Sequence, residues 1–150
     1  MPQRQLDFQS INDAIAELER LEKSGCASLG NWDFAQVCDH LSFFVEGALD
    51  GHQFKVPWIF KAMFGRMVLN RILSKRHMKP GVFTPQKPLP LPGGDPKAAA
   101  ARLRKALVRM RDHMGEFHDS PFFGHLTPDQ WCELQTIHCA HHFGFLEPKV

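Results

Sequence analysis

Three of the nine histidines lie close together near the C-terminus, at His138, His141 and His142 in the pattern His-x-x-His-His. In a helix, His138 and His142 lie one turn apart on the same face, so both imidazoles can converge on one ion. His40 is the candidate third ligand, because it lies in the middle of a predicted helix among apolar residues. Three histidines leave positions open for water or substrate, as in catalytic sites, and neutral imidazoles suit zinc, nickel or iron. The spacing therefore predicts a divalent metal site at His40, His138 and His142.

Two alternatives stay open at this point. Histidines on an apolar face are often hydrogen-bonded core residues rather than ligands. Spacing alone also leaves His141 as an alternative to His142, because His141 belongs to an equally regular helical series. That series is Trp131, Leu134, His138, His141 and Phe145.

The motifs of several other reaction classes are missing from the sequence. It contains no His-Glu-x-x-His, no Gly-x-Ser-x-Gly, no Walker loop and no Rossmann glycine fingerprint. The cysteines lack zinc-ribbon spacing, and neither Cys38 nor Cys139 projects toward its neighbouring histidine. Five further histidines fall in loops or near helix ends, and we expect them at the surface: His52, His77, His113, His118 and His125.

The elements that must position the three histidines are predicted to be helices. Apolar residues recur at helical spacing in five segments, most of which begin at a capping residue. The first expected helix has about 14 residues, from the Ser10-x-x-Asp13 signal to Gly25, and the second is capped by Asn31 and ends near Leu49. The third starts at Pro57 and has a basic polar face. The fourth is capped by Asp95 and runs from Lys97 to about Phe117, and the fifth is capped by Thr127 and runs from Pro128 to about Leu146.

The remaining segments are expected to be irregular. Residues 80–96 hold six prolines and three glycines, which predicts a long ordered loop. Residues 120–126 are expected to form an aromatic turn, and no strand is expected, because no convincing alternation of apolar and polar residues occurs. The pattern predicts an all-α four-helix bundle in one domain, residues 1–150, with the basic helix and the proline-rich loop inserted between its second and third helices.

The composition is that of an ordinary folded domain. With 150 residues, 43% of them apolar, the chain can bury a core without disulfides or metal, so a bound metal would serve function. The N-terminus lacks the apolar run of a secretory signal, and no apolar stretch is long enough to span a membrane. Because the four cysteines also show no disulfide framework, we expect a cytoplasmic protein.

The net charge of +2 hides a strong segregation of charge. Residues 1–50 carry three Lys or Arg against nine Asp or Glu, whereas residues 51–94 carry eight basic residues and no acidic one. The small net charge argues against a nucleic-acid partner. We expect the basic segment to be a solvated face; the alternatives are a contact with an anionic membrane surface and the entrance to a pocket for an anionic small molecule. The apolar third helix has more surface than one bundle covers, so a homodimer is also expected.

Three segments carry a resemblance to a known family. They are Asn31-Trp-Asp-Phe-Ala-Gln-Val-Cys-Asp-His40-Leu, Phe122-Phe-Gly-His-Leu-Thr-Pro-Asp-Gln-Trp131 and His138-Cys-Ala-His-His142. With them, almost the whole sequence resembles the DinB/YfiT-like superfamily of metal-dependent enzymes, and more closely a small subfamily known only as a domain of unknown function. The resemblance implies a bundle of up-down-down-up topology and metal ligation by His40, His138 and His142, with His141 as a neighbour that packs or supports the ligands.

The resemblance also implies an activity. Characterised relatives resemble metal-dependent transferases and isomerases that use low-molecular-weight thiols such as bacillithiol, mycothiol or glutathione. A metal with an open position lowers the pKa of a bound thiol or water and presents it to an electrophile. We therefore expect a thiol-dependent S-transferase or a hydrolase acting on a small molecule. The alternative is a non-catalytic stress-response module that binds a metal or a small ligand.

Overall fold

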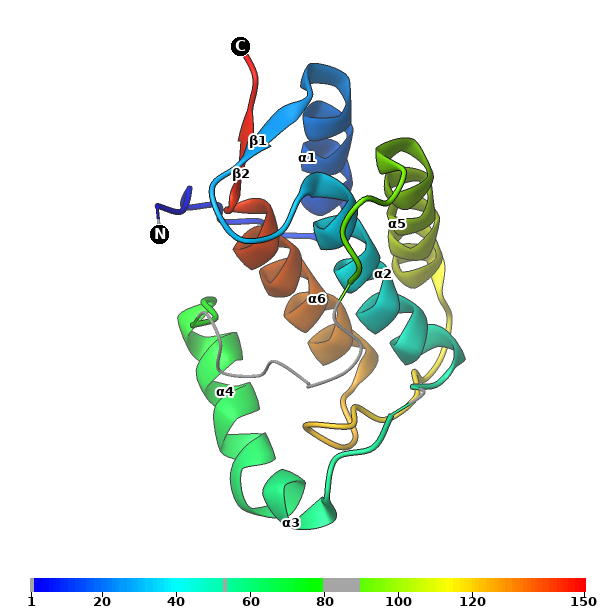
Figure 1. The fold of residues 1–150 in the computed structure, drawn as a ribbon. Coiled ribbons are helices and arrows are strands. Elements are labelled where there is room, and N and C mark those ends of the chain that lie inside the picture. The colour runs from blue at the N-terminus through cyan, green and yellow to red at the C-terminus, as the bar shows by residue number, and fades with distance from the viewer. Residues whose placement is uncertain (1, 53, 80–89) are drawn as a thin grey trace.

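The structure is a computed structural model that describes residues 2–52, 54–79 and 90–150. It is mostly helical, as expected, with one small two-stranded sheet (Figure 1). The elements are α1 (Ile11–Ser24), β1 (Cys26–Ser28), α2 (Phe34–Asp50), α3 (Trp58–Phe60), the π-helical segment η1 (Lys61–Gly65), α4 (Arg66–Lys75), α5 (Pro96–Asp112), α6 (Pro128–Phe143) and β2 (Leu146–Pro148).

Side-chain caps explain where two of the long helices begin. The Asp95 carboxylate accepts a hydrogen bond from the backbone N–H of Lys97 at the start of α5. The Thr127 hydroxyl accepts one from the backbone N–H of Gln130 at the start of α6. Both caps were expected, because each satisfies a donor that the first turn of a helix leaves unpaired. Ser10 also occupies the N-cap position of α1, but its side chain forms no capping bond.

The start of α2 corrects the sequence-based prediction. Its N-cap is Asp33 rather than Asn31. The Asp33 carboxylate accepts from the backbone N–H of Gln36, and the Gln36 side chain accepts from the backbone N–H of Asp33. This reciprocal pair satisfies two donors at once, so the helix begins two residues later than expected. Asn31 lines a cavity instead.

Two expected helix ends are also wrong. Helix α5 ends at Asp112 rather than near Phe117, because the chain leaves the helical conformation and turns at Gly115, whose φ is 97°. Helix α6 ends at Phe143 rather than near Leu146, since Leu146 enters a strand. In both cases apolar residues beyond the helix end continued the pattern that the prediction followed.

The two-stranded sheet contradicts the expectation that the chain has no strands. Strand β1 pairs antiparallel with β2, with Cys26 opposite Pro148 and Ser28 opposite Leu146. Each strand has three residues, which is too short for an alternating pattern to be visible in the sequence. The pairing ties the connection between α1 and α2 to the C-terminal end of the chain.

Helices α1, α2, α5 and α6 contact one another around the core. Helix α2 packs on α5 and α6, and α1 packs on the same two helices. Each contributes buried residues to one hydrophobic cluster, among them Leu18, Leu41, Leu107 and Phe143. Because α2 and α6 are neighbours, side chains from the middle of one can reach side chains of the other.

Residues 58–75 form a further helical segment of α3, η1 and α4 in direct succession. It begins one residue after Pro57, which is its N-cap rather than its first residue. Helix α4 packs against α6 and buries Leu69 and Ile72. Most of the proline-rich segment expected to follow it, residues 80–89, lies outside the described residues. None of the helices in the described ranges has the length and apolar character that crossing a lipid bilayer requires.

Candidate metal centre

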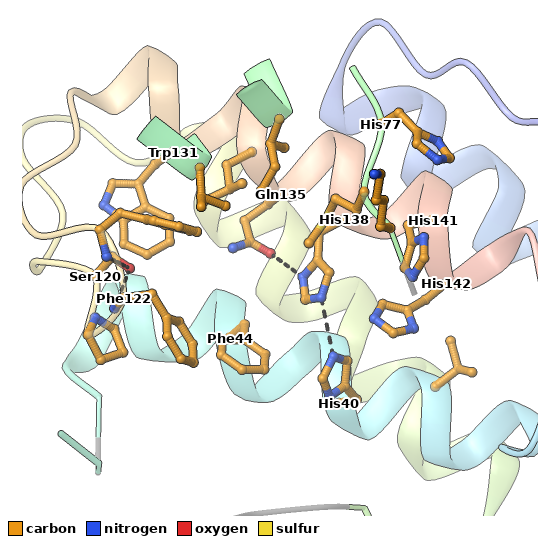
Figure 2. Close-up of a pocket in the computed structure, with 18 of the residues that line it drawn as sticks. His40, Phe44, His77, Ser120, Phe122, Trp131, Gln135, His138, His141 and His142 are labelled. Atoms are coloured by element: carbon orange, nitrogen blue, oxygen red, sulfur yellow. Dashed lines mark hydrogen bonds between the residues drawn. The ribbon is translucent and has the colours of Figure 1, made fainter. Parts of the chain in front are cut away.

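His40, His138 and His142 are brought together by the packing of α2 on α6. His40 lies in the middle of α2, and the other two lie one turn apart in the last two turns of α6. Figure 2 shows the three imidazoles facing one another between these helices. His40 and His138 are 98 positions apart in the sequence, so only the tertiary fold brings them into contact. The structure assembles the residues that spacing selected, and their ligation of a metal stays a prediction.

The ring nitrogens are spaced as metal ligands are. His40 Nε2 lies 3.2 Å from His138 Nε2, and the three candidate ligand nitrogens all lie within 4.8 Å of one another. Two imidazole nitrogens bound to one tetrahedral zinc ion at about 2.0–2.1 Å are roughly 3.3 Å apart. The first pair already has this separation, and the third nitrogen, up to 4.8 Å from the others, must move closer for all three to bind one ion. The donor set fits a divalent transition metal.

Gln135 fixes the position of the proton on His138. Its Oε1 lies 3.1 Å from His138 Nδ1, and both side chains are buried (Figure 2). An amide oxygen can only accept a hydrogen bond, so Nδ1 carries the proton and Nε2 keeps its lone pair. That lone pair lies on the side of the ring that faces His40. A hydrogen bond to the non-ligating nitrogen is also the usual support of a metal-bound histidine.

Burial keeps the three imidazoles neutral. It lowers the pKa of His40 to about 4, with a smaller repulsive contribution from His141. Burial first, and repulsion among the neighbouring imidazoles second, also lower the pKa of His138 and His142 well below the usual value of 6.5. Metal ligation requires neutral imidazole, so at neutral pH the cluster does not have to release protons before it binds an ion.

Two aromatic side chains enclose the cluster. The Trp32 ring stacks on His142 at a centroid distance of 5.5 Å and lies 4.7 Å from the ring of His40. Phe44, one turn after His40 in α2, contacts the rings of His40 and His138 at 5.0 and 5.5 Å. These apolar surfaces hold the imidazoles in place and reduce the access of water, which strengthens electrostatic interactions at the cluster.

The cluster lies in the wall of a cavity of about 660 Å³, a volume typical of small-molecule sites. Phe44, Phe122 and Trp131 line the cavity, and Phe44 lies next to His40 and His138 (Figure 2). Arg71 and Lys79 add positive charge to the lining, whereas no Asp or Glu lines the cavity among the residues that the structure describes. The site is therefore apolar, cationic at two positions, and wide enough for a ligand beside the histidines.

His141 lies beside the cluster and not within it. Its Nδ1 is 3.4 Å from the side-chain amide of Gln3, which also donates a hydrogen bond to the backbone oxygen of His141. The ring packs edge-on against His142 at a centroid distance of 4.8 Å. The group that could hold a metal consists of His40, His138 and His142. Geometry thus favours the pair one helical turn apart over the alternative that spacing left open.

The expectation that His52 lies at the surface is wrong. His52 is half-buried, lines the cavity and stacks on Trp131 at a centroid distance of 5.9 Å. Burial lowers its pKa to about 4. The ring reaches this position because Gly47 has no side chain: a β-carbon there would lie 2.5 Å from the imidazole.

The other histidines outside the cluster largely follow the prediction. His77, His118 and His125 are exposed, as expected. His113 is half-buried instead, because its ring packs on Phe117 at a centroid distance of 4.5 Å. Of these four, only His77 lines the cavity.

The cysteines take no part in the cluster. All four are free thiols. Burial raises the pKa of Cys38 far above its usual range and that of Cys139 to about 12. A thiol must be ionised to act as a nucleophile, so these shifts disfavour that role for both residues. Neither cysteine belongs to the group of side chains that could hold a metal.

Sequence reasoning missed three residues that support the cluster: Trp32, Phe44 and Gln135. Two of them carried a recoverable signal. Gln135 precedes His138 by three residues and Phe44 follows His40 by four, so each shares a helix face with a candidate ligand. Trp32 lies in a loop, and no periodicity could have placed it over His142.

The fold and this site define a mostly helical protein with a three-histidine group that could hold a metal, next to an apolar cavity. Sequence comparison then gives its family. The family described as "Protein of unknown function (DUF1569)" matches residues 1–149, and the chain belongs to this family. The match confirms the expected assignment to a domain of unknown function. No curated protein and no solved structure matches the chain.

Proposed function

We propose that this protein is a metal-dependent enzyme in which His40, His138 and His142 bind one divalent transition-metal ion. The observation that carries the proposal is the meeting of three neutral imidazoles, with ligand nitrogens within 4.8 Å of one another, in the wall of a cavity large enough for a substrate. A site that served only structure would be closed by a fourth protein ligand. Zinc, nickel and ferrous iron all suit this donor set.

A bound ion would supply Lewis-acid chemistry by lowering the pKa of a coordinated thiol or water. The protein's own residues prepare the site for it. Gln135 holds His138 in the tautomer that presents Nε2, and Trp32 and Phe44 fix the neighbouring rings and exclude water. We propose a low-molecular-weight thiol as the co-substrate. Its sulfur would form a bond to an electrophilic carbon of the second substrate, the thiol proton would pass to solvent, and the group bonded to that carbon would leave. Hydrolysis is the variant in which water replaces the thiol.

The cavity lining supports a second substrate with an apolar body and a negatively charged group. Aromatic rings, including those of Phe122 and Trp131, can pack on apolar or aromatic groups. Arg71 and Lys79 can pair with a carboxylate, sulfonate or phosphate. The absence of Asp and Glu from the described lining means that an anion meets no repulsion from these residues.

The proposal includes the DinB-like four-helix bundle. Its support is that α1, α2, α5 and α6 pack around one core and that the three histidines come from α2 and α6, as the resemblance implies. The basic helical segment and the proline-rich residues are then an insertion between α2 and α5. We also propose a cytoplasmic location, which the four free cysteines support.

One observation favours a second function, a metal- or ligand-binding module of the stress response without turnover. No carboxylate lines the described part of the cavity, and burial lowers the pKa of His52 and His141 to about 4. At neutral pH such imidazoles are weak bases. A reaction that needs a strong general base would therefore find none in this lining.

Elemental analysis of tag-free protein, purified without a nickel column, tests the metal site. We expect about one metal ion per chain in the wild type and in His141→Ala, which changes a neighbouring imidazole outside the cluster. His138→Ala and His142→Ala should lose the ion while the helical circular dichroism spectrum persists, since the core is large enough without it.

Wild-type protein that is folded, metal-free and unable to take up zinc, nickel or ferrous iron would overturn the proposal and leave the histidines as core residues. Loss of metal from His141→Ala as well would overturn the assignment of the three ligands. Once metal stoichiometry is established, consumption of glutathione or bacillithiol with an aromatic electrophile distinguishes the enzyme from the binding module.

A further inference from the structure

The helical segment at residues 58–75 has an inner face that is fixed against the rest of the protein. Gly65, Leu69 and Ile72 are buried on this face. At Gly65 the approach is so close that a β-carbon would lie 2.5 Å from the backbone oxygen of Phe122. Only a glycine permits so close an approach, because any other residue would place its β-carbon against the Phe122 backbone. Rotating the segment would bring a side chain to this position, so these contacts determine which side of the segment points away from the fold.

The outer face of the same segment is apolar and uncovered. Six of the nine large apolar residues exposed in the described chain lie within residues 58–67, and between 45% and 74% of each is exposed. They are Trp58, Ile59, Phe60, Met63, Phe64 and Met67. We expected this helix to have more apolar surface than one bundle covers, and the inner face alone makes the contact with the core. In Figure 1, α3 and α4 lie at the edge of the molecule.

Positive charge surrounds this apolar face. The exposed Arg66 lies among the six apolar residues, and the exposed Lys55 and Lys75 lie beyond its two ends. Lys61 is partly buried and lies beside Gly124 instead. Residues 51–94 contain no Asp or Glu to balance them. Trp and Phe on one side with Lys and Arg around them is the composition of helices that lie in the plane of a membrane surface.

We propose that residues 58–67 dock the protein on an anionic membrane surface. The apolar side chains would enter the boundary between headgroups and acyl chains, and the flanking cations would contact anionic headgroups. A second copy of the chain is a poorer occupant. In a symmetric dimer this face would meet itself, so Arg66 would approach the Arg66 of the other copy without an acidic residue from either segment to balance the charge. The proposal does not depend on the metal centre.

Flotation with lipid vesicles tests the proposal. Wild-type protein should float with vesicles of phosphatidylcholine and phosphatidylglycerol at low ionic strength, stay behind with phosphatidylcholine alone, and be released by salt. Arg66→Ala should weaken the binding about fivefold, as expected for one cation near a charged surface. The double variant Met63→Ser/Met67→Ser should weaken it at least as much, because it removes two inserting side chains.

Two controls match these variants in chemistry but lie elsewhere. Met114→Ser changes an exposed methionine, and Lys105→Ala changes an exposed cation on α5. Both should float like the wild type. All these positions are exposed, so circular dichroism should show unchanged helix content.

Absence of flotation with anionic vesicles at low salt would overturn the proposal. Equal weakening by the control variants would also overturn it, because binding would then not depend on this face. Analytical ultracentrifugation gives the competing outcome: a dimer that Met63→Ser/Met67→Ser dissociates would show that a second copy covers the face instead of lipid.

Discussion

The side chain of Gln135 offers a sharp test of the metal centre, because it touches the candidate site without being a ligand. Its Oε1 accepts the Nδ1 proton of His138 at 3.1 Å, and Gln135 itself is only 2% exposed. Gln135→Leu keeps a buried side chain of similar size and removes the acceptor. The proton on Nδ1 is then left without a partner, and the tautomer with Nε2 free is no longer favoured.

The expected loss of affinity follows from this single hydrogen bond. Removing the partner that orients a metal-bound histidine typically lowers metal affinity about 10- to 100-fold, or roughly 1.4–2.8 kcal/mol. Gln135→Glu keeps an acceptor at the same place and should retain most of the affinity. Gln3→Leu is the matched control, because it removes an amide from His141, the histidine beside the cluster, and should leave affinity unchanged.

Competition with a chromophoric zinc chelator at neutral pH measures these affinities in metal-free protein. Circular dichroism spectra should first show that all three variants retain their helix content. If Gln135→Leu binds zinc within about twofold of the wild type, the argument from the His138 tautomer is refuted. If Gln3→Leu weakens binding as much as Gln135→Leu, the effect is general to the cavity and does not come from the His138 contact.

Three further predictions concern stability, each measured by urea unfolding of metal-free protein. Arg4→Ala should lower the free energy of unfolding by about 3 kcal/mol. The Arg4 guanidinium contacts Glu17 at 2.7 Å in a mostly buried ion pair and donates hydrogen bonds to the backbone oxygens of Phe143 and Leu146. A decrease below about 1 kcal/mol would contradict this prediction. Thr127→Ala should cost about 1 kcal/mol through loss of the α6 cap without changing metal content. Burial lowers the pKa of His52 to about 4, so on going from pH 7 to pH 5 the unfolded chain takes up a proton that the folded chain excludes. The free energy of unfolding should fall by roughly 1 kcal/mol from this partly solvated residue, and the fall should be shallower by that amount in His52→Phe.

Local signals were enough for most of the secondary structure. Asp95 and Thr127 cap their helices as predicted, because a cap needs only a side-chain oxygen and a backbone N–H three or fewer residues away. The prediction failed where a nearby competitor was stronger, as when the Asp33–Gln36 pair replaced Asn31. It also failed for β1 and β2, whose pairing joins residues about 120 positions apart and has no local pattern.

The exposed face at residues 58–67 shows a different limit. Apolar residues repeat there at helical spacing, which in most helices indicates the side that meets the core. The structure uses Gly65, Leu69 and Ile72 for that contact and leaves the larger side chains outside. A glycine carries no apolar signal, so the sequence could show a surplus of apolar surface on this helix but not that Gly65 makes its closest contact with the fold.

The sequence by itself determined that the protein is mostly helical, that His138 and His142 share one face of a helix, and that His40 lies within another. These properties depend on spacing along one helix, which residue order alone sets. Tertiary structure decided that the three rings meet, that Gln135 orients one of them, and that Trp32, Phe44 and His52 surround the cavity. Those contacts join segments far apart in the chain, and their geometry depends on how α2, α6 and the loops pack, which no local pattern records.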